Sequence, residues 1–337
     1  MFAYLQFMVA GPLVIVLSGA TAPPNAQEAA LPTVAEIRQA WTHRSKTTGP
    51  YALQAELTEQ VAIKGRPLSD DPFETRRFGR EVNLVTVQKT IAIRKDGVKV
   101  RTAVVGKSVD SDNGNVSEQQ HHSSFDGRLY KTLGKRADAP FGLGAFGTGE
   151  TILSLTHKTV EFQAIDWWCD PIVLWKRLPD ENVQVSVTDL KLPSCERVKL
   201  QVMEHGRIRS AIIVSKSRPY LPLEFTQYSI SGKEDKRCTF VYSSDANGHA
   251  RLMSWHAVYF EPDGSIRRKL KGKVSDFSHG KPFDAEELNL RFPVGTHIIE
   301  YVGERRKTWI QASPTEIKPM QESDYGKLPD GSGRPAS

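Results

Sequence analysis

Cysteine is scarce in this chain, with three residues among 337. The three, Cys169, Cys195 and Cys238, lie too far apart for a C-x-x-C redox pair or a zinc knuckle. Because their number is odd, at least one thiol has no disulfide partner within the chain. One disulfide, in any of three pairings, and three buried free thiols are both compatible with the sequence.

Motifs that specify a reaction are also lacking. The nine histidines show no H-E-x-x-H spacing, and no G-x-S-x-G nucleophile turn occurs. The segment 109–114 does not fit a calcium-binding loop, because Val109 and Ser111 occupy positions that require acidic or amide ligands. We therefore predict a protein that is not an enzyme and has no cofactor and no metal. Carboxylates that meet only in the fold leave an unrecognised hydrolase as an open alternative.

The segment 142–147 matches G-x-G-x-x-G literally but lacks the context of a nucleotide site. Asp138-Ala139-Pro140 precedes it, and no alternation of strands and helices surrounds it. We predict a Gly-rich loop over 135–149 that lies over the mouth of a pocket.

Neither sign of charge is strongly depleted, with 45 Lys and Arg against 39 Asp and Glu. At 39% hydrophobic and 25% charged residues, the chain is too apolar for disorder and too polar for a multi-span membrane protein. The densest basic run contains Arg267, Arg268, Lys269, Lys271 and Lys273. Such a run can contact nucleic acid or an anionic membrane, but nucleic-acid-binding motifs are missing. We predict the solvated side of a hairpin and no nucleic-acid partner.

Residues 1–26 contain no Asp, Glu, Lys or Arg. The apolar run from Phe7 to Leu17 has the length of a signal-peptide core, about 7–15 residues, and is shorter than the roughly 20 of a membrane span. Ala20-Thr21-Ala22 fits the cleavage pattern. We predict a signal peptide at 1–26 and a periplasmic or secreted protein. The missing basic residue before the apolar run leaves an uncleaved anchor as the alternative.

Hydrophobic periodicity changes at about residue 50. Before it, Thr33 and Glu36 form a capping-box pattern at the start of a helix over 33–46, with Trp41 on its apolar face. After it, apolar and polar residues alternate, although Lys89 interrupts the apolar side of one segment. Pairs such as Asp96-Gly97 separate these segments and are typical of hairpin turns.

This pattern predicts a mainly β (α+β) fold. We expect a strongly curved antiparallel sheet, a half-barrel meander, wrapped around the N-terminal helix and one or two short helices. One of these helices begins at Asp170-Pro171. The half-barrel forms a single domain over 32–312, and residues 313–337 form a flexible C-terminal tail.

Aromatic residues gather in the middle of the chain, around residues 162–175. They are either ordinary core or the lining of an apolar cavity, in which large rings supply contact area for a lipid or acyl group. The candidate ligand-binding residues of such a lining are Trp41, Phe162, Trp167, Trp168 and Trp175.

The order of these elements resembles the outer-membrane lipoprotein carrier (Lol-type) half-barrel superfamily. The resemblance covers most of residues 32–312 and includes the closing run Leu288–Tyr301, with its Phe292-Pro293-Val294-Gly295-Thr296, and the strand entry Arg218–Phe225. It implies a curved sheet around helices with an apolar cavity between them, in which carriers hold acyl chains. The resemblance is to the order of elements rather than to a ligand-contacting motif, so it assigns no binding residue here. The loops at 65–80 and 107–120 are additional.

Two functions follow as hypotheses. The first is a periplasmic, non-enzymatic binding protein that holds a lipid, a lipoprotein acyl chain or a similar apolar ligand in the half-barrel. The second is a module that senses or binds an envelope protein and has no small-molecule ligand.

Overall fold

The computed structural model describes residues 31–47, 49–63, 84–136, 142–148, 161–165, 183–192, 195–216, 220–244, 250–302 and 305–320. The chain divides into two units, Met1–Leu31 and Pro32–Ser337. The predicted leader, the helix at Asp170-Pro171 and residues 321–337 of the predicted tail lie outside the described residues. Within the same predicted tail, Glu316–Pro319 forms a strand that pairs with the strand before it. The boundaries predicted for the leader, the domain and the tail stay predictions.

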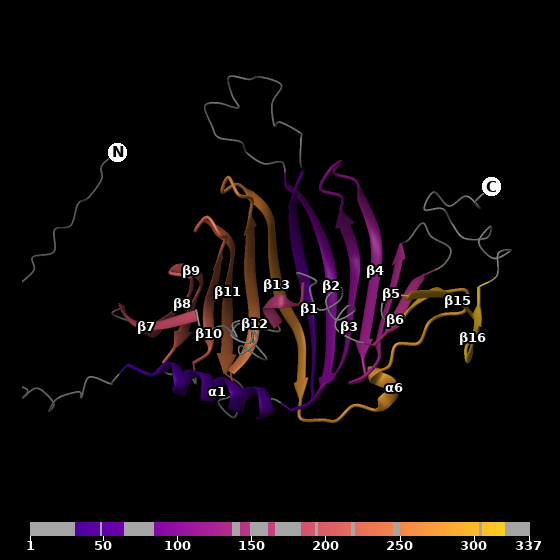
Figure 1. Ribbon diagram of the computed structural model, residues 1–337, viewed down its shortest axis with the longest axis horizontal. Helices are drawn as coiled ribbons and strands as arrows, with labels where there is room; N and C mark the ends of the chain where they lie inside the picture. Colours follow the sequence, from indigo (N-terminus) through magenta and orange to yellow (C-terminus); the bar gives the residue numbers. More distant parts are fainter. Residues whose placement is uncertain are drawn as a thin grey trace, which may run out of the picture. The chain divides into compact units, whose positions relative to one another are not determined.

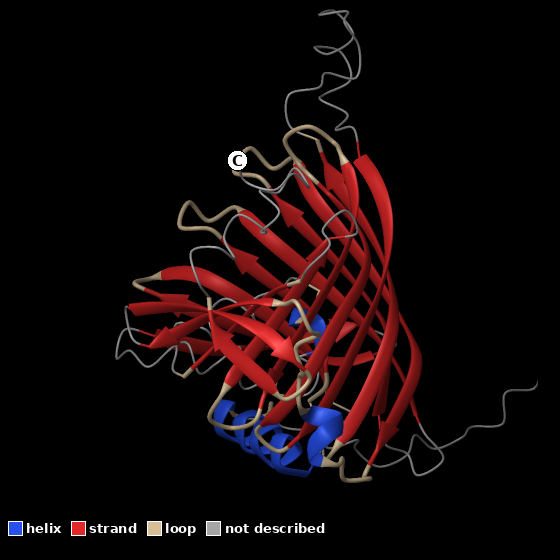
Figure 2. Cartoon of the chain, turned by 90° about the vertical axis from the view of Figure 1, so that its right-hand side faces the viewer, coloured by secondary structure: helices blue, strands red, loops and turns tan. Residues whose placement is uncertain are grey.

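The strands of the described residues form one open, curved sheet (Figures 1 and 2). In chain order they are β1 Tyr51–Ala62, β2 Leu84–Asp96, β3 Lys99–Val109, β4 Val116–Phe125, β5 Tyr130–Arg136, β6 Leu143–Gly147, β7 Val183–Leu192, β8 Cys195–Glu204, β9 Arg207–Ser215, β10 Pro222–Tyr228, β11 Glu234–Ser244, β12 Ala250–Phe260, β13 Ile266–His279, β14 His297–Val302, β15 Arg305–Ser313 and β16 Glu316–Pro319. The predicted mainly β half-barrel is confirmed.

Sheet order follows chain order over two long stretches. It reads β16-β15-β14-β6-β5-β4-β3-β2-β1-β13-β12-β11-β10-β9-β8-β7. β1 to β6 form one antiparallel meander and β7 to β13 form another, and the two meet where β1 pairs with β13. β14 then pairs with β6 in parallel, which departs from the predicted all-antiparallel pairing.

Hairpin turns occur where Asp-Gly and similar pairs predict them. Gly97, Gly127, Gly206 and Gly264 all have positive φ, between 57° and 98°, at the ends of adjacent strands. At the β8–β9 turn His205 also has positive φ, 50°, as a two-residue turn with both central residues left-handed requires. Local turn chemistry therefore sets the register of each meander.

Helix α1, Val34–Thr47, begins with the predicted capping box. The Thr33 amide donates to Glu36 Oε2 at 2.6 Å, and the Glu36 amide donates to Thr33 Oγ1 at 3.2 Å. Ile37 and Trp41 are fully buried against the sheet, whereas Gln39 on the opposite side of the helix is exposed. The amphipathic pattern thus places α1 on the concave face of the sheet.

The Gly-rich segment predicted as a loop is a strand instead. Leu143–Gly147 forms β6, which pairs with β5 on one side and β14 on the other. A Cβ on Gly144 would lie 2.8 Å from the Phe292 ring, so the glycine permits this ring to pack on the convex face. Pairing with two neighbours outweighs the low strand propensity of glycine, which is why the local pattern misleads.

The concave face of the sheet carries most of the core. Alternate residues of neighbouring strands point to this face and join α1 in one buried cluster. We call its sheet part the apolar half; its central members are Leu53, Leu57, Ile91, Leu200, Ile212, Phe225, Phe240, Trp255 and Leu270.

Trp255 lies against a glycine of the neighbouring strand. It is 2% exposed and faces Gly272 across the β12–β13 pair. A Cβ on Gly272 would stand 2.2 Å from the indole ring. The glycine therefore allows the ring to lie close to the backbone at the middle of the sheet.

Candidate functional site

Charged side chains enter the concave face at three neighbouring strands. Glu59 of β1, Lys89 of β2 and Arg268 of β13 occupy inward positions that apolar residues fill elsewhere on these strands. Lys89 is the residue that interrupts the apolar pattern in the sequence. Burying a charge is costly unless it is paired, so each of these three requires a partner.

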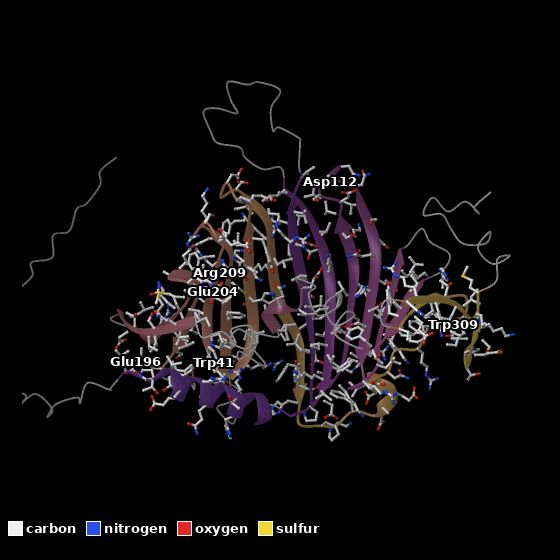
Figure 3. The ribbon with its side chains drawn as sticks, in the orientation of Figure 1. Trp41, Asp112, Glu196, Glu204, Arg209 and Trp309 are labelled. Carbon is white, nitrogen blue, oxygen red and sulfur yellow. The ribbon has the colours of Figure 1, made fainter. Side chains whose placement is uncertain are left out.

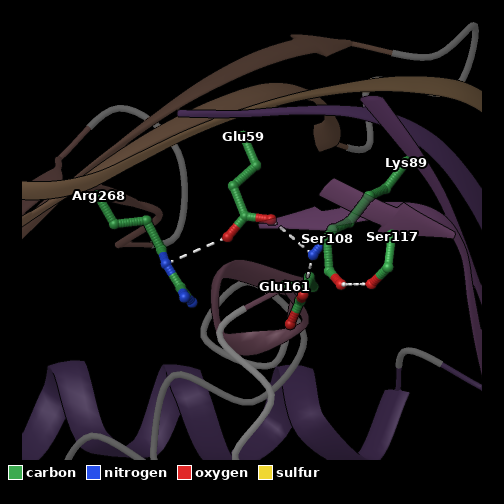
Figure 4. Close-up of polar contacts among 6 residues, drawn as sticks. All are labelled: Glu59, Lys89, Ser108, Ser117, Glu161 and Arg268. Carbon is green, nitrogen blue, oxygen red and sulfur yellow. Dashed lines mark hydrogen bonds and ion pairs between the residues drawn. The ribbon is translucent and has the colours of Figure 1, made fainter. Parts of the chain in front are cut away.

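The partners are each other and Glu161 (Figure 4). Lys89 Nζ lies 2.6 Å from Glu59 Oε2 and 2.9 Å from Glu161 Oε1. Arg268 Nε lies 3.1 Å from Glu59 Oε1. The side chains of Lys89 and Glu59 are 3% and 2% exposed, whereas Arg268 is 32% exposed, so this network of two cations and two anions is buried at Lys89 and reaches the surface at Arg268. Its charges balance.

The network keeps Lys89 charged. Burial lowers the pKa of Lys89, but the nearby carboxylates of Glu161 and Glu59 outweigh burial and hold the pKa above its ordinary value. A lysine held protonated is a hydrogen-bond donor and not a nucleophile. The charged Lys89 therefore holds Glu161 in place through their 2.9 Å ion pair.

Glu161 begins a short turn, Glu161–Ile165, that lies between the sheet and α1 (Figure 4). Its apolar side chains Phe162, Ala164 and Ile165 are buried in the same cluster as α1. Seen from the sheet, this 161–165 turn occupies the concave side of the half-barrel.

A second buried lysine holds the other polar residue of the turn. Lys236 Nζ of β11 donates to Gln163 Oε1 at 2.5 Å, and the Tyr259 hydroxyl lies 3.4 Å from the same oxygen. Lys236 Nζ also lies 5.2 Å from the centre of the Tyr259 ring. The 161–165 turn is thus fastened to the sheet at two points, through Lys89 and Lys236.

The thiol of Cys238 lies in the same region and is inert. Cys238 is fully buried, and burial raises the pKa of its thiol far above the ordinary range. It is free, as the odd number of cysteines permits. Cys169 and the side chain of Cys195 are outside the described residues, so their predicted pairing stays open.

Two of the five predicted lining residues lie together on the concave side. Trp41 of α1 (Figure 3) is fully buried. Its indole Nε1 donates to the Tyr220 carbonyl at 2.7 Å. Phe162 is 5% exposed and belongs to the same cluster. Trp167, Trp168 and Trp175 fall outside the described residues. A ligand-binding role for any of the five stays a prediction.

Beyond the ion network the concave face becomes polar. Thr102 and Ser123 share a buried hydrogen bond of 2.6 Å, and Ser108 and Ser117 approach at 3.5 Å. His121 lies opposite Val104 of β3 and therefore points inward, and burial lowers the pKa of its ring although Glu161 opposes this. We call these residues of β3 and β4 the polar half.

Glu59, Arg268, Lys236 and Gln163 were missed as site residues by the sequence analysis. Arg268 lies within a run of basic residues. It differs from its neighbours in that run only in pointing to the concave face, which follows from strand alternation once β13 is paired. Among the described residues, no group of His, Cys, Asp or Glu is arranged to hold a metal ion. No helix in the same part of the chain has the length and apolarity needed to cross a bilayer.

No family model and no curated protein matches the chain. Solved structures do align with it. A putative outer membrane lipoprotein-sorting protein domain from Vibrio parahaemolyticus is 13% identical, with 75% of this chain and 95% of that chain covered and a TM-score of 0.39. A LolA superfamily protein from Nitrosomonas europaea is 10% identical, with 77% and 98% covered and a TM-score of 0.41.

A DUF1329 family protein from Desulfovibrio piger aligns similarly, at 11% identity, with 76% and 99% covered and a TM-score of 0.44. Two of these three structures carry names of the Lol type that the sequence resembles. At such low identity they carry no binding residue to this chain.

Proposed function

We propose that this chain is an exported, non-enzymatic binding protein that holds an apolar ligand, such as the acyl chain of a lipid or lipoprotein, against the concave face of its half-barrel. The observation that supports this most is the apolar half itself. It is a curved apolar surface over which α1 and the 161–165 turn lie. An acyl chain gains about 0.8 kcal/mol for each methylene it buries, so such a surface can compete with a membrane.

The arrangement of the turn suggests where the ligand enters. Phe162, Ala164 and Ile165 contact the apolar half much as an acyl chain would, and only Glu161 and Gln163 attach the turn through polar contacts. A ligand that takes the place of these apolar side chains must break those contacts. We therefore expect the strength of the two attachments to set the affinity.

The polar half supports a ligand with a polar head. It adjoins the ion network at Lys89, so a chain lying on the apolar half would direct its head toward the Ser and Thr hydroxyls. A fatty acid or a phospholipid has this division into a long apolar part and a short polar part.

Titration of delipidated protein with a fluorescent fatty acid tests the proposal. We expect saturable uptake by the native protein and uptake several-fold tighter by Gln163→Ala, because one attachment of the turn is removed. Gln54→Ala changes an exposed glutamine on the convex face of β1 and should leave uptake unchanged. Delipidated protein that takes up no fatty acid would contradict the proposal.

A module that binds or senses an envelope protein is the second candidate. The complete burial of Trp41 and the near-complete burial of Phe162 favour it, because a filled core leaves no place for a ligand. It predicts no fatty-acid uptake and a partner captured from envelope extracts at low salt. A low-salt capture that recovers no protein would count against it.

A further inference from the structure

The basic run that stands out in the sequence is divided by the sheet. Arg268 turns to the concave face and pairs with Glu59, as described above. Alternation places Lys269, Lys271 and Lys273 on the convex face of β13, and Arg267 precedes them at the bulge opposite Tyr259 and Phe260. We call these four residues the basic row. The hairpin side predicted as solvated therefore carries three lysines in line, with Arg267 next to them at the bulge.

The basic row lies near the middle of the sheet. β13 stands between β12 and β1, with six strands beyond it on one side and nine on the other (Figure 1). Alternate residues of a strand are about 6.8 Å apart, so the three lysines span about 14 Å. A convex surface meets a flat one along its middle strands first. The row thus occupies the line along which a planar partner would touch the sheet.

Few opposite charges accompany the row. Gln60, Thr58 and Glu56 of β1 face Lys269, Lys271 and Lys273 in turn, so one carboxylate adjoins four cations. On the other side β12 contributes Val258, His256 and Ser254 at the same levels. None of the four cations forms an ion pair within the part of the chain that the structure describes. Asp276 lies farther along β13, past the bulge opposite Gln54.

The composition of this surface favours a lipid surface over a protein. Protein interfaces are enriched in aromatic residues and depleted in lysine, whereas the row has three lysines and its neighbours on β1 and β12 include no aromatic residue. Lysines bind an array of anionic headgroups through charge alone, without shaped pockets. We propose that the convex face docks on an anionic phospholipid bilayer through the basic row.

This docking is independent of the ligand proposed for the concave face. Because the row and the apolar half lie on opposite faces of the same strands, a docked half-barrel keeps its concave side away from the bilayer surface. The attraction should weaken as salt screens it, over a Debye length of about 8 Å at physiological ionic strength.

Co-sedimentation of the full chain with vesicles tests the proposal. One set contains phosphatidylcholine and phosphatidylglycerol in equal amounts, and the other contains phosphatidylcholine alone. We expect binding to the anionic set that exceeds binding to the neutral set and falls with added sodium chloride. The difference between the two sets removes any binding through the apolar leader, which does not require anionic lipid.

The variant Lys269→Gln/Lys271→Gln/Lys273→Gln should lower the affinity for anionic vesicles on the order of 100-fold, since each lysine near a membrane contributes about one factor of five. A matched variant, Lys99→Gln/Lys135→Gln/Lys307→Gln, removes the same charge from exposed lysines of β3, β5 and β15. This matched variant should lower the affinity for anionic vesicles by less than about 10-fold. Both variants keep the core intact, and thermal unfolding checks this.

Three outcomes would overturn the proposal. The first is no preference of the native protein for anionic vesicles. The second is an equal loss in the two variants, which would show an effect of net charge only. The third is row-dependent capture of an acidic protein or of RNA without vesicle binding, which would assign the surface to another partner.

Discussion

The concave face of this half-barrel has two parts that differ in chemistry although they share one sheet. The apolar half carries large side chains in strands β8 to β13 and in β1 and β2, and α1 and the 161–165 turn cover it. The polar half on β3 and β4 presents small hydroxyl residues and His121, beside Val100 and Val104 of the core. The ion network of Glu59, Lys89, Glu161 and Arg268 lies where the two meet. The same curvature thus supports packing on one side and polar contact on the other.

This difference shows how the covering turn is positioned. Apolar contacts alone are non-directional, whereas the network fixes Glu161 on Lys89 and the second attachment fixes Gln163 on Lys236. The boundary is therefore where single substitutions should have the largest effects, and the polar half is where they should have the smallest.

Lys89→Met should have the largest effect. It leaves Glu161 buried without its cation and leaves Glu59 with Arg268 alone, so we expect the free energy of unfolding to fall by about 3–5 kcal/mol. Urea denaturation measures this. Lys216→Met is the control, because the Lys216–Asp189 pair is more exposed, at 14% and 26%, and should contribute about 1 kcal/mol or less. Equal losses of unfolding free energy in the two variants would show that the buried network contributes no more to stability than the more exposed Lys216–Asp189 pair.

The effect of Lys89 should depend on pH in the alkaline range. Because burial lowers its pKa but Glu161 and Glu59 raise it more, the pKa in the folded protein lies above its ordinary value. A raised pKa means that the stabilisation is complete below the pKa of an unfolded lysine, about 10.4, and is lost as the pH rises through the folded value. The stability difference between the native protein and Lys89→Met should therefore stay constant from neutral pH to about pH 10 and shrink above it. A difference that shrinks between neutrality and pH 9 would contradict this.

Gly272→Ala should come next. Its Cβ would stand 2.2 Å from the Trp255 ring, so overpacking should cost about 1–3 kcal/mol of unfolding free energy. Gly134→Ala is the matched change on β5, where the nearest atom to a new Cβ is the Leu143 carbonyl oxygen at 4.0 Å. It should be close to neutral. If the two variants lose the same unfolding free energy, the claim that side chains pack more tightly around Gly272 than around Gly134 is contradicted.

Ser123→Ala should have the smallest effect. It removes the 2.6 Å hydrogen bond to Thr102, which contributes about 1 kcal/mol. Ser108→Ala, whose contact with Ser117 is longer at 3.5 Å, should lose less than half of that. Chemical denaturation of both variants gives the comparison. A loss above that of Gly272→Ala would place the stability of the sheet in the polar half instead.

Local features of the fold were predictable from the sequence. The capping box of Thr33 and Glu36, the hairpin pairs and the strand alternation are short-range signals, and each leads directly to an element. The pairing of β1 with β13 and of β6 with β14 was not predictable, because these partners lie far apart in the chain and no local pattern specifies them. The strand β6 was therefore expected to be a loop.

The candidate site was only partly predictable for the same reason. Lys89 stood out because it breaks an apolar alternation, and Trp41 and Phe162 stood out as large rings. Glu59 and Arg268 become inward residues only once β1 and β13 are paired, and Gln163 gains its role from Lys236 on a distant strand. Long-range pairing, rather than composition, creates the network.

Native mass spectrometry of protein purified from the envelope of its own host tests the central claim most directly. If the apolar half holds an acyl chain, the spectra should show a lipid-sized adduct on the folded chain, and the adduct should disappear on delipidation and return when a fatty acid is added. Folded protein that carries no adduct and regains none would contradict the account of the concave face.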